Sequence, residues 1–301
     1  MDLNIGTASG SWDNSPHKKA EPLKNEKNEI ALVVHACDRY RMLFKGFEYF
    51  FKKNWPAVKG INFYFLTEDI DYHSDLFANI KTGQAEWSDR LRAGLQQLSE
   101  PLVIYMQEDM WFKKPVNEKI LQEILDFAIA ENPLLLKLHS SEVYQTHPTG
   151  KIFGGLLLSR LSNQASKYLM SHQVSVWNRK FLVSQLLKNE HPWRNERKAT
   201  KRLKKLDLPL YQIDLLAENG KPAVNKNISN ACRSEYQTVS VNGTLNDNAL
   251  PFIEELVASA DGELSAYGNR LKHNFSHRLT HDGLPRPRRV GFIKKIFHFS
   301  R

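Results

Sequence analysis

Short apolar runs alternate along the first half of the chain with segments in which apolar residues recur at helical spacing. The runs are rich in β-branched and aromatic residues, which is typical of strands buried on both faces of a parallel sheet. In the segments between them, apolar positions at i, i+3 and i+4 predict helices that cover such a sheet. The predicted strands are 30–34, 61–66, 102–106 and 134–138, and the predicted helices are 40–54, 87–98 and 117–128.

The order of these elements predicts an α/β sandwich with a mostly parallel central sheet over roughly residues 30–139. Local signals set the helix ends, because Pro56 ends the first helix and Ser88 and Asn117 are the expected N-caps of the next two. Farther along, the pattern is less regular, and beyond Ala217 it favours no element. It predicts a strand at 152–158 and helices at 161–170, 178–187 and 192–205.

The two ends of the chain depart from this pattern. Residues 1–29 are polar and lack the apolar stretch of a secretory signal, so we expect a flexible arm. Residues 286–301 interleave Lys and Arg with Phe and Ile and hold no acid, which is typical of an amphipathic helix on an anionic membrane surface. The alternative is a tail helix whose apolar face docks on the domain. The expected membrane contacts are Arg288, Arg289, Phe292, Lys294, Lys295 and Phe297.

Charge and cysteine content bear on the possible partners and on the cellular location of the protein. The chain of 301 residues has a net charge of +9, which can serve anionic lipid, nucleic acid, nucleotide phosphates or solubility alone. Its two cysteines, Cys37 and Cys232, cannot form a disulfide framework, and no apolar run is long enough to span a bilayer. We therefore expect a cytoplasmic protein.

The candidate chemistry lies where the predicted strands end, because ligands of open α/β sheets bind at the carboxyl ends of the strands. The first strand ends on residues 35–40 and the third on Gln107, Glu108 and Asp109. Neither is followed by GxGxxG or GxxxxGK[ST]. The usual signatures of a dehydrogenase, a Rossmann methyltransferase and a P-loop kinase are therefore missing.

Glu108 and Asp109 are two adjacent carboxylates at the end of a hydrophobic strand, and carboxylates are rarely buried without a partner. Mg²⁺ or Mn²⁺ is a suitable partner, and the same ion can bridge a diphosphate and neutralise a departing nucleotide. The alternative is an acidic surface turn paired with Lys113 or Lys114.

Seven segments stand in a characteristic order along the chain: Val33–Tyr40, Trp55-Pro56, Phe63–Glu68, Trp87–Leu91, Tyr105–Phe112, Val176–Leu182 and Pro192–Glu196. In this order they resemble a group of bacterial GT-A-type glycosyltransferases that build surface polysaccharides such as lipopolysaccharide and capsule. The resemblance covers roughly residues 30–200. It implies a GT-A-like (nucleotide-diphospho-sugar transferase) α/β fold, with a nucleotide-sugar half at 30–139 and an acceptor half at 140–285.

By this resemblance, Gln107-Glu108-Asp109 stands where such enzymes carry a DxD-like metal motif. Asp109, with Glu108 second, would bind Mn²⁺ or Mg²⁺, and Gln107 and Glu108 would also contact the nucleotide-sugar. The sequence departs from the strict pattern because the first acid is Gln107, so a metal-independent variant stays open.

The resemblance also places the donor-binding residues. Asp38, beside Arg39, would face the base or ribose of the donor, and its alternative role is the N-cap of the helix that follows. Arg90 would reach the diphosphate, where its planar fork of donors fits phosphate oxygens. Its alternative is a surface pair with Asp89 or Glu86.

Glu196 is the candidate general base, because inverting transfer needs a carboxylate that takes the proton from the attacking acceptor hydroxyl. The stereochemical outcome stays open. Trp177 and Trp193 are the aromatic residues expected to lie under the acceptor sugar. The alternative for Glu196 is that it only offsets the basic residues around it on a solvated helix face.

The sequence thus predicts a hexosyltransferase that moves a sugar from a nucleotide-sugar to a glycan or lipid-linked glycan, at the cytoplasmic face of the inner membrane. A UDP-sugar is the first candidate for the donor. A nucleic-acid-binding protein that uses the basic runs at 194–205 and 286–301 is the rival, although no nucleic-acid fold motif supports it and nucleic acid is not the expected partner. A third hypothesis is a non-catalytic glycan-binding domain, which stays open because Gln107 replaces the first acid of the metal motif.

Overall fold

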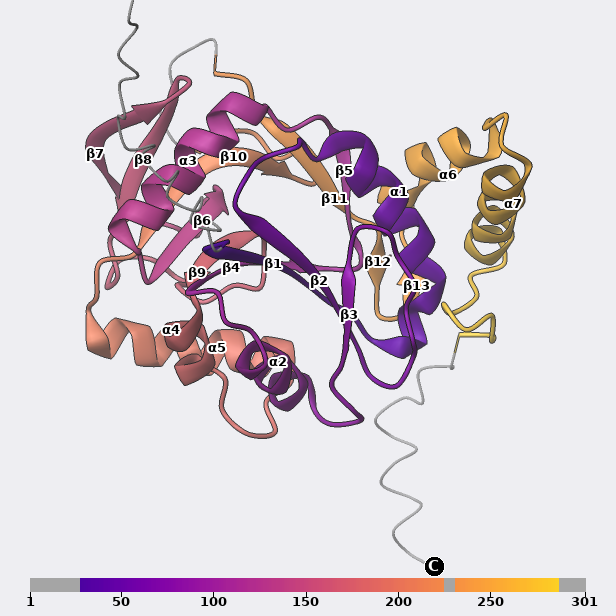
Figure 1. Cartoon of the computed structure of the whole chain (residues 1–301), viewed down its shortest axis with the longest axis horizontal. Coiled ribbons are helices and arrows are strands. Elements are labelled where there is room, and N and C mark those ends of the chain that lie inside the picture. Colours follow the sequence, from indigo (N-terminus) through magenta and orange to yellow (C-terminus); the bar gives the residue numbers. More distant parts are fainter. Residues whose placement is uncertain (1–27, 225–230, 287–301) are drawn as a thin grey trace, which may run out of the picture.

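One large mixed β-sheet forms the centre of the molecule (Figure 1). The structure, a computed structural model, describes residues 28–224 and 231–286. The strands follow the order β3-β2-β1-β4-β9-β6-β10-β11-β5 across the sheet. All strands on this path except β9 and β5 run in the same direction, which confirms the mostly parallel α/β sheet predicted from the sequence.

In chain order, the strands and helices have the following first and last residues. The strands are β1 (Ile30–His35), β2 (Ile61–Thr67), β3 (Ala78–Lys81), β4 (Leu102–Gln107), β5 (Met110–Lys114), β6 (Leu135–His139), β7 (Thr146–Phe153), β8 (Leu156–Leu161), β9 (Ser175–Asn178), β10 (Tyr211–Glu218), β11 (Ser234–Thr238), β12 (Ser240–Val241) and β13 (Thr244–Leu245). The helices are η1 (Asp38–Leu43), α1 (Phe44–Asn54), α2 (Trp87–Gln96), α3 (Glu118–Glu131), α4 (Arg179–Gln185), α5 (Pro192–Leu206), η2 (Asp247–Ala249), α6 (Leu250–Val257) and α7 (Gly262–Ser276).

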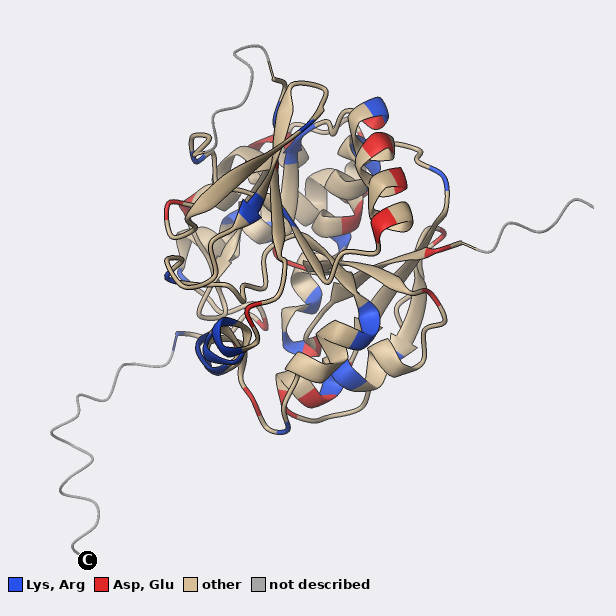
Figure 2. Cartoon of the chain, turned by 90° about the vertical axis from the view of Figure 1, so that its left-hand side faces the viewer, with Lys and Arg blue, Asp and Glu red and all other residues tan. Residues whose placement is uncertain are grey.

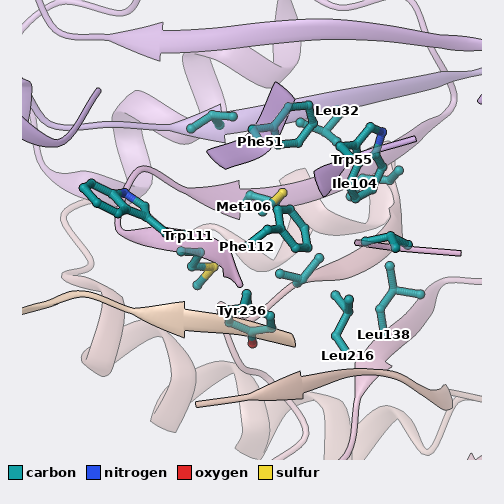
Figure 3. Close-up of a cluster of buried hydrophobic side chains, with 14 of the residues drawn as sticks. Leu32, Phe51, Trp55, Ile104, Met106, Trp111, Phe112, Leu138, Leu216 and Tyr236 are labelled. Atoms are coloured by element: carbon teal, nitrogen blue, oxygen red, sulfur yellow. The ribbon is translucent and has the colours of Figure 1, made fainter. Parts of the chain in front are cut away.

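The central strands are buried on both faces because their apolar runs supply side chains to two cores. In β1, Leu32 and Val34 join one cluster, while Ala31 and Val33 join the other. This is the period of two expected of a strand. Helices α1, α3, α6 and α7 cover the first cluster, part of which Figure 3 shows, and α2, α4 and α5 cover the second.

All of the helices and strands predicted before residue 140 are present. Asn117 caps α3 as predicted, since its side chain accepts a hydrogen bond from the backbone N–H of Ile120. Ser88 does not cap α2. It lies inside the helix, after Glu86, and its hydroxyl accepts a hydrogen bond from the backbone N–H of Glu190 (2.9 Å).

Two predictions after residue 140 are wrong. The residues expected to form one strand at 152–158 belong to two strands, the end of β7 and the start of β8. Gly154 and Gly155 adopt positive φ and reverse the chain between them. The expected helix at 161–170 is irregular. Its backbone is held by side chains instead, since the N–H groups of Leu169 and Met170 both donate to the Thr200 hydroxyl.

Three further findings bear on the expectations above. No helix within 28–224 or 231–286 is long and apolar enough to cross a membrane. The expected arm lies almost entirely in residues 1–27, outside the described residues. The expected membrane contacts Arg288, Arg289, Phe292, Lys294, Lys295 and Phe297 also lie outside them.

Candidate active site

A cleft of about 540 Å³ opens where several strands of the sheet end. His35 at the end of β1 and Gln107 at the end of β4 are paired in register, so the two strands deliver adjacent residues to it. Strand β9 runs antiparallel to β4, and the residues just before it, His172 and Gln173, meet the same edge. The first turn of α5 and the chain after β11 close the cleft.

Glu108 and Asp109 form a turn at the floor of this cleft. Their backbone is fixed, since the Glu108 carbonyl accepts from the Trp111 indole (3.0 Å) and the Asp109 carbonyl accepts from the backbone N–H of Val239 (2.9 Å). The Glu108 side chain is 4% exposed, and it accepts a long hydrogen bond from the backbone N–H of Cys37 (3.4 Å). The Asp109 Oδ1 atom is buried and meets no hydrogen-bond donor in the part of the chain that the structure describes.

Burial raises the pKa of both carboxyl groups, and the neighbouring Asp109 charge raises the pKa of Glu108 further. The expected alternative of a surface turn paired with Lys113 or Lys114 does not hold, because both lysines pair with Glu235 instead. Two adjacent buried carboxylates without a cation are unfavourable at neutral pH, so the site suits a bound cation.

These residues fit a divalent ion that also binds phosphate. No group of three or more His, Cys, Asp and Glu within the described ranges could hold a metal by itself. Mg²⁺ and Mn²⁺ bound to nucleotides need only one or two protein carboxylates, because phosphate oxygens and water complete the coordination. Asp109 and Glu108 are the residues that would hold such an ion. Gln107 donates its amide N–H to the Tyr105 hydroxyl (2.9 Å) and adds no charge.

Arg39 and Arg90 supply positive charge to the cleft. Arg90 lies on α2 with its side chain 5% exposed, and it donates to the Ala36 carbonyl (2.9 Å) and approaches Glu68 (3.4 Å). The expected surface pair with Asp89 or Glu86 is therefore absent. Buried here, a guanidinium is fixed in place and retains donors for an anion.

Asp38 does not line the cleft. One carboxylate oxygen accepts from the backbone N–H of Glu68, and the other accepts from those of Asp69 and Ile70, at 2.8–2.9 Å. It is not the helix N-cap either, because Cys37 occupies that position. Asp38 instead ties the loop after β2 to the loop after β1, and its neighbours Arg39 and Tyr40 are the ones that face the cleft.

The opposite wall carries Glu196 and Trp193, both on the first turns of α5. One Glu196 oxygen accepts from the backbone N–H of His172 (3.0 Å). Burial raises the pKa of Glu196, while that hydrogen bond and the charge of buried Lys137 oppose the rise. Trp193 is 63% exposed at the rim of the cleft.

Trp177 does not reach the cleft, which corrects the expectation that it lies under the acceptor. Its indole is 1% exposed and packs on Phe181 (ring centroids 6.4 Å apart). The alternation of β9 accounts for this, because Val176 points into one core and Trp177 into the other.

The structure adds cleft residues that the sequence did not single out. The Trp87 ring lies at a tilt to those of His172 and His35, with centroids 4.2 Å and 5.7 Å away. Burial lowers the pKa of both histidines, so both are neutral. A helix-starting Trp in the segment 87–91 was the available signal for Trp87. The chain at 238–242 also lines the cleft. Its signal was the Asn242-Gly243 pair, which turns the hairpin β12–β13 with positive φ.

Comparisons with known proteins give distant similarities only. No family model matches the chain, and no curated protein matches it. Among solved structures, TarS residues 1–349 from S. aureus in complex with UDP-GlcNAc is 9% identical, with a TM-score of 0.45 over 83% of this chain and 72% of that one. The chain spans 43% of the longer TarS chain.

Two other structures show similar values. The mannosyltransferase PcManGT from Pyrobaculum calidifontis, in complex with GDP-Man and Mn²⁺, is 7% identical, with a TM-score of 0.44 over 84% of this chain and 76% of that one. A CMP:2-keto-3-deoxy-manno-octonic acid synthetase with CTP is 13% identical, with a TM-score of 0.38 over 63% and 90%. What the cleft of this chain can do follows from its own residues.

Proposed function

We propose that the chain is a glycosyltransferase that moves a hexosyl group from a nucleotide-sugar to a hydroxyl of a glycan or lipid-linked glycan. A UDP-sugar is the first candidate for the donor. One observation carries this proposal: the Glu108–Asp109 turn is buried at the floor of a cleft with an acidic oxygen that lacks a partner among the described residues. A divalent ion with a diphosphate satisfies both the carboxylates and the buried Arg90 nearby.

The donor would lie between the ends of β1 and β4, in the half of the domain at 30–139. Arg39 and Arg90 would bind phosphate oxygens, and Gln107 and Glu108 would contact the sugar or the diphosphate. Mn²⁺ or Mg²⁺, when bound by Asp109 and Glu108, would neutralise the leaving diphosphate. Neutral His35 and Trp87 would form an apolar floor without adding charge.

The acceptor would enter from the side of α5, in the half of the domain at 140–285. Glu196 would take the proton of the acceptor hydroxyl as that oxygen bonds to the anomeric carbon and the bond from this carbon to the diphosphate breaks. The hydrogen bond from the backbone of His172 fixes one Glu196 oxygen and leaves the other for the proton. Trp193 would stack on the acceptor sugar.

We place the enzyme at the cytoplasmic side of the inner membrane, in the synthesis of a bacterial surface polysaccharide such as lipopolysaccharide or capsule. This setting follows the resemblance of residues 30–200 and the basic, apolar-rich segment 286–301. The arm at 1–29, the domain at 30–285 and the tail at 286–301 are the corresponding division of the chain.

A panel of UDP-, GDP-, CMP- and TDP-sugars, each with and without MnCl₂, tests the proposal by the release of free nucleotide. We expect slow release from one donor class, with water as the acceptor, and a requirement for the metal. If no donor in the panel yields nucleotide and none binds, the enzyme proposal is refuted.

Gln107 favours a second function, since a non-catalytic glycan-binding domain has no need of a first acid in that motif. Such a domain would bind oligosaccharides through Trp193 and would ignore nucleotides. Glycan binding that survives Asp109→Asn, without nucleotide binding, would identify it.

A further inference from the structure

Helix α5 carries a dense row of basic residues on its outer face, and the row begins at the mouth of the cleft. Figure 2 shows Lys and Arg gathered on this helix, seen nearly end-on at the lower left. The exposed basic residues are Arg194, Arg197, Lys198, Lys201 and Lys205. Arg197, Lys201 and Lys205 recur every four residues after Trp193, so these side chains share one face over about 18 Å.

The inner face of α5 fixes the helix to the domain. Ala199 and Leu203 are buried in the second core, and the Asn195 amide donates to the Gln185 carbonyl (2.8 Å) and to Glu190 (2.7 Å). The outer row cannot turn inward, so it is a permanent feature of the surface.

The charges of this row are largely unneutralised. Lys198 approaches Glu190 at 3.6 Å, and Arg202, on the flank, approaches it at the same distance. Arg197, Lys201 and Lys205 form no ion pair with any residue in 28–224 or 231–286. An excess of unpaired cations on one face attracts an anionic partner.

Exposed apolar side chains lie near the two ends of the helix. Trp193 at the start of α5 is 63% exposed and Leu206 at its end is 52% exposed, while Leu187 in the preceding turn is 43% exposed. Lys and Arg between exposed Trp and Leu residues are the composition of a surface that lies at a lipid interface, where the rings and aliphatic groups enter the headgroup region.

The shape of the surface favours a bilayer over a single-stranded nucleic acid. Proteins that bind single-stranded nucleic acid hold it in a basic groove. The cations of α5 instead stand on the convex side of a helix, which contacts a plane along its whole length. Glu196 and Trp193 lie at the end of the same helix, so a bilayer on this face would lie at the mouth of the cleft.

We propose that the outer face of α5, with Arg197, Lys201 and Lys205 at its centre, docks the protein on an anionic phospholipid surface and presents the cleft to that surface. This inference rests on the proposed function only where it gives a reason for turning the cleft towards the membrane, because the docking itself requires no catalysis. It assigns to the folded domain a membrane contact separate from that expected of residues 286–301.

Vesicle binding tests the proposal with the full-length chain. We would measure co-sedimentation with phosphatidylcholine vesicles that contain or lack phosphatidylglycerol, for the wild type and for Arg197→Ser/Lys201→Ser/Lys205→Ser. Each cation near an anionic surface contributes to partitioning, so we expect the triple variant to bind on the order of a hundredfold more weakly, and only where phosphatidylglycerol is present. Added salt should weaken wild-type binding in the same way.

The control is Lys59→Ser/Lys119→Ser/Lys272→Ser, which removes the same charge from exposed positions elsewhere. It should bind vesicles as the wild type does. Equal losses in both variants would show an effect of net charge alone, and unchanged binding of the α5 variant would place the contact elsewhere; either result overturns the proposal. So would an α5 variant that loses affinity for single-stranded RNA and keeps its affinity for vesicles.

Nucleotide binding separates this inference from the proposed function. The α5 variant should keep the affinity of the wild type for the donor nucleotide, because its substituted side chains lie outside the cleft. If the chain binds vesicles through α5 and binds no nucleotide, the docking proposal stands and the proposed glycosyltransferase function fails.

Discussion

At the residue scale, the cleft concentrates charged groups that are costly to bury. Glu108 and Asp109 lie side by side with raised pKa values, and Glu196 is partly buried across the cleft. Among the buried polar atoms that meet no hydrogen-bond partner within the described chain, Asp109 Oδ1 belongs to a carboxylate that lines the cleft. Groups retained at such a cost are characteristic of a ligand site.

Glu196→Gln separates catalysis from binding. The amide keeps the shape of the side chain and can still accept from the His172 N–H, but it cannot take a proton. We expect turnover to fall about 10²- to 10⁴-fold, the usual contribution of a general base, while the nucleotide affinity stays the same. Steady-state rates and a nucleotide titration measure the two effects, with exposed Glu142→Gln as the matched control. Wild-type turnover in the Glu196 variant would remove this residue from the mechanism.

Lys137 gives the fold a pH dependence. It is fully buried on β6, bonded to the Ser171 hydroxyl (2.7 Å), and burial lowers its pKa to about 7. Between that value and the ordinary pKa of 10.5, the unfolded chain holds a proton that the folded chain has lost, so the free energy of unfolding rises with pH. The slope is at most about 1.4 kcal/mol per pH unit.

Lys137→Met should remove this part of the rise. Urea unfolding at pH 7 and pH 9 measures it, and the difference between the variant and the wild type isolates Lys137 from other titrating groups. Exposed Lys167→Met is the control and should keep the wild-type slope. Identical slopes in the wild type and the Lys137 variant would mean that the lysine stays charged when buried.

The sequence predicted some residues of the cleft and missed others for identifiable reasons. Glu108 and Asp109 were found because a buried strand must deliver its last residues to the edge of the sheet. The predictions for Asp38 and Trp177 are wrong. Neither a resemblance nor the residue type distinguishes a carboxylate that ties two loops together from one that faces a ligand, or a core indole from one that contacts a sugar. His172 belongs to an irregular segment with no periodic pattern.

At the element scale, α1 packs closely at Gly46 against Trp111 of β5 and Tyr267 of α7. A Cβ atom built there would lie 2.2 Å from the Trp111 ring and 2.8 Å from the Tyr267 hydroxyl, whose oxygen also accepts from the Gly46 N–H (3.0 Å). Trp111 is fully buried and stacks on Phe50, so it has no room to move.

Gly46→Ala should therefore destabilise the protein by about 1–3 kcal/mol, the usual cost of overpacking, although alanine is the better helix former. Gly262→Ala is the control, because a Cβ atom at that position of α7 meets nothing within 4 Å. Thermal unfolding of the two variants checks the contrast. A Gly46 variant as stable as the wild type would show that Trp111 can move aside.

Prediction of elements succeeded where apolar periodicity was long and failed where tertiary contacts decide. Strand β1 and helix α3 are predictable because the apolar residues of each fit the pattern of a single kind of secondary structure. The apolar pattern at 152–158 predicts one strand although the Gly154-Gly155 pair turns the chain there between β7 and β8. Strand β11 has a polar sequence that becomes buried only against β5 and β10.

At the scale of the whole molecule, the sheet brings together residues that lie far apart in the chain. The cleft takes its floor from β1 and β4, one wall from α2 and the other from α5. The α/β class and the mostly parallel sheet followed from the sequence, whereas the insertion of antiparallel β9 between β4 and β6 did not, because pairing between distant strands leaves no local signal.

The most direct test of the nucleotide-sugar site is thermal unfolding of the wild type and Asp109→Asn with UDP, GDP, CMP and TDP, each with and without Mn²⁺. A ligand that binds only the folded state adds about 2.7 kcal/mol at a hundredfold excess over Kd. We predict that one nucleotide stabilises the wild type only with Mn²⁺, and that Asp109→Asn folds normally and loses this response. A wild type that responds to no nucleotide, or a variant that responds as the wild type does, would contradict the account.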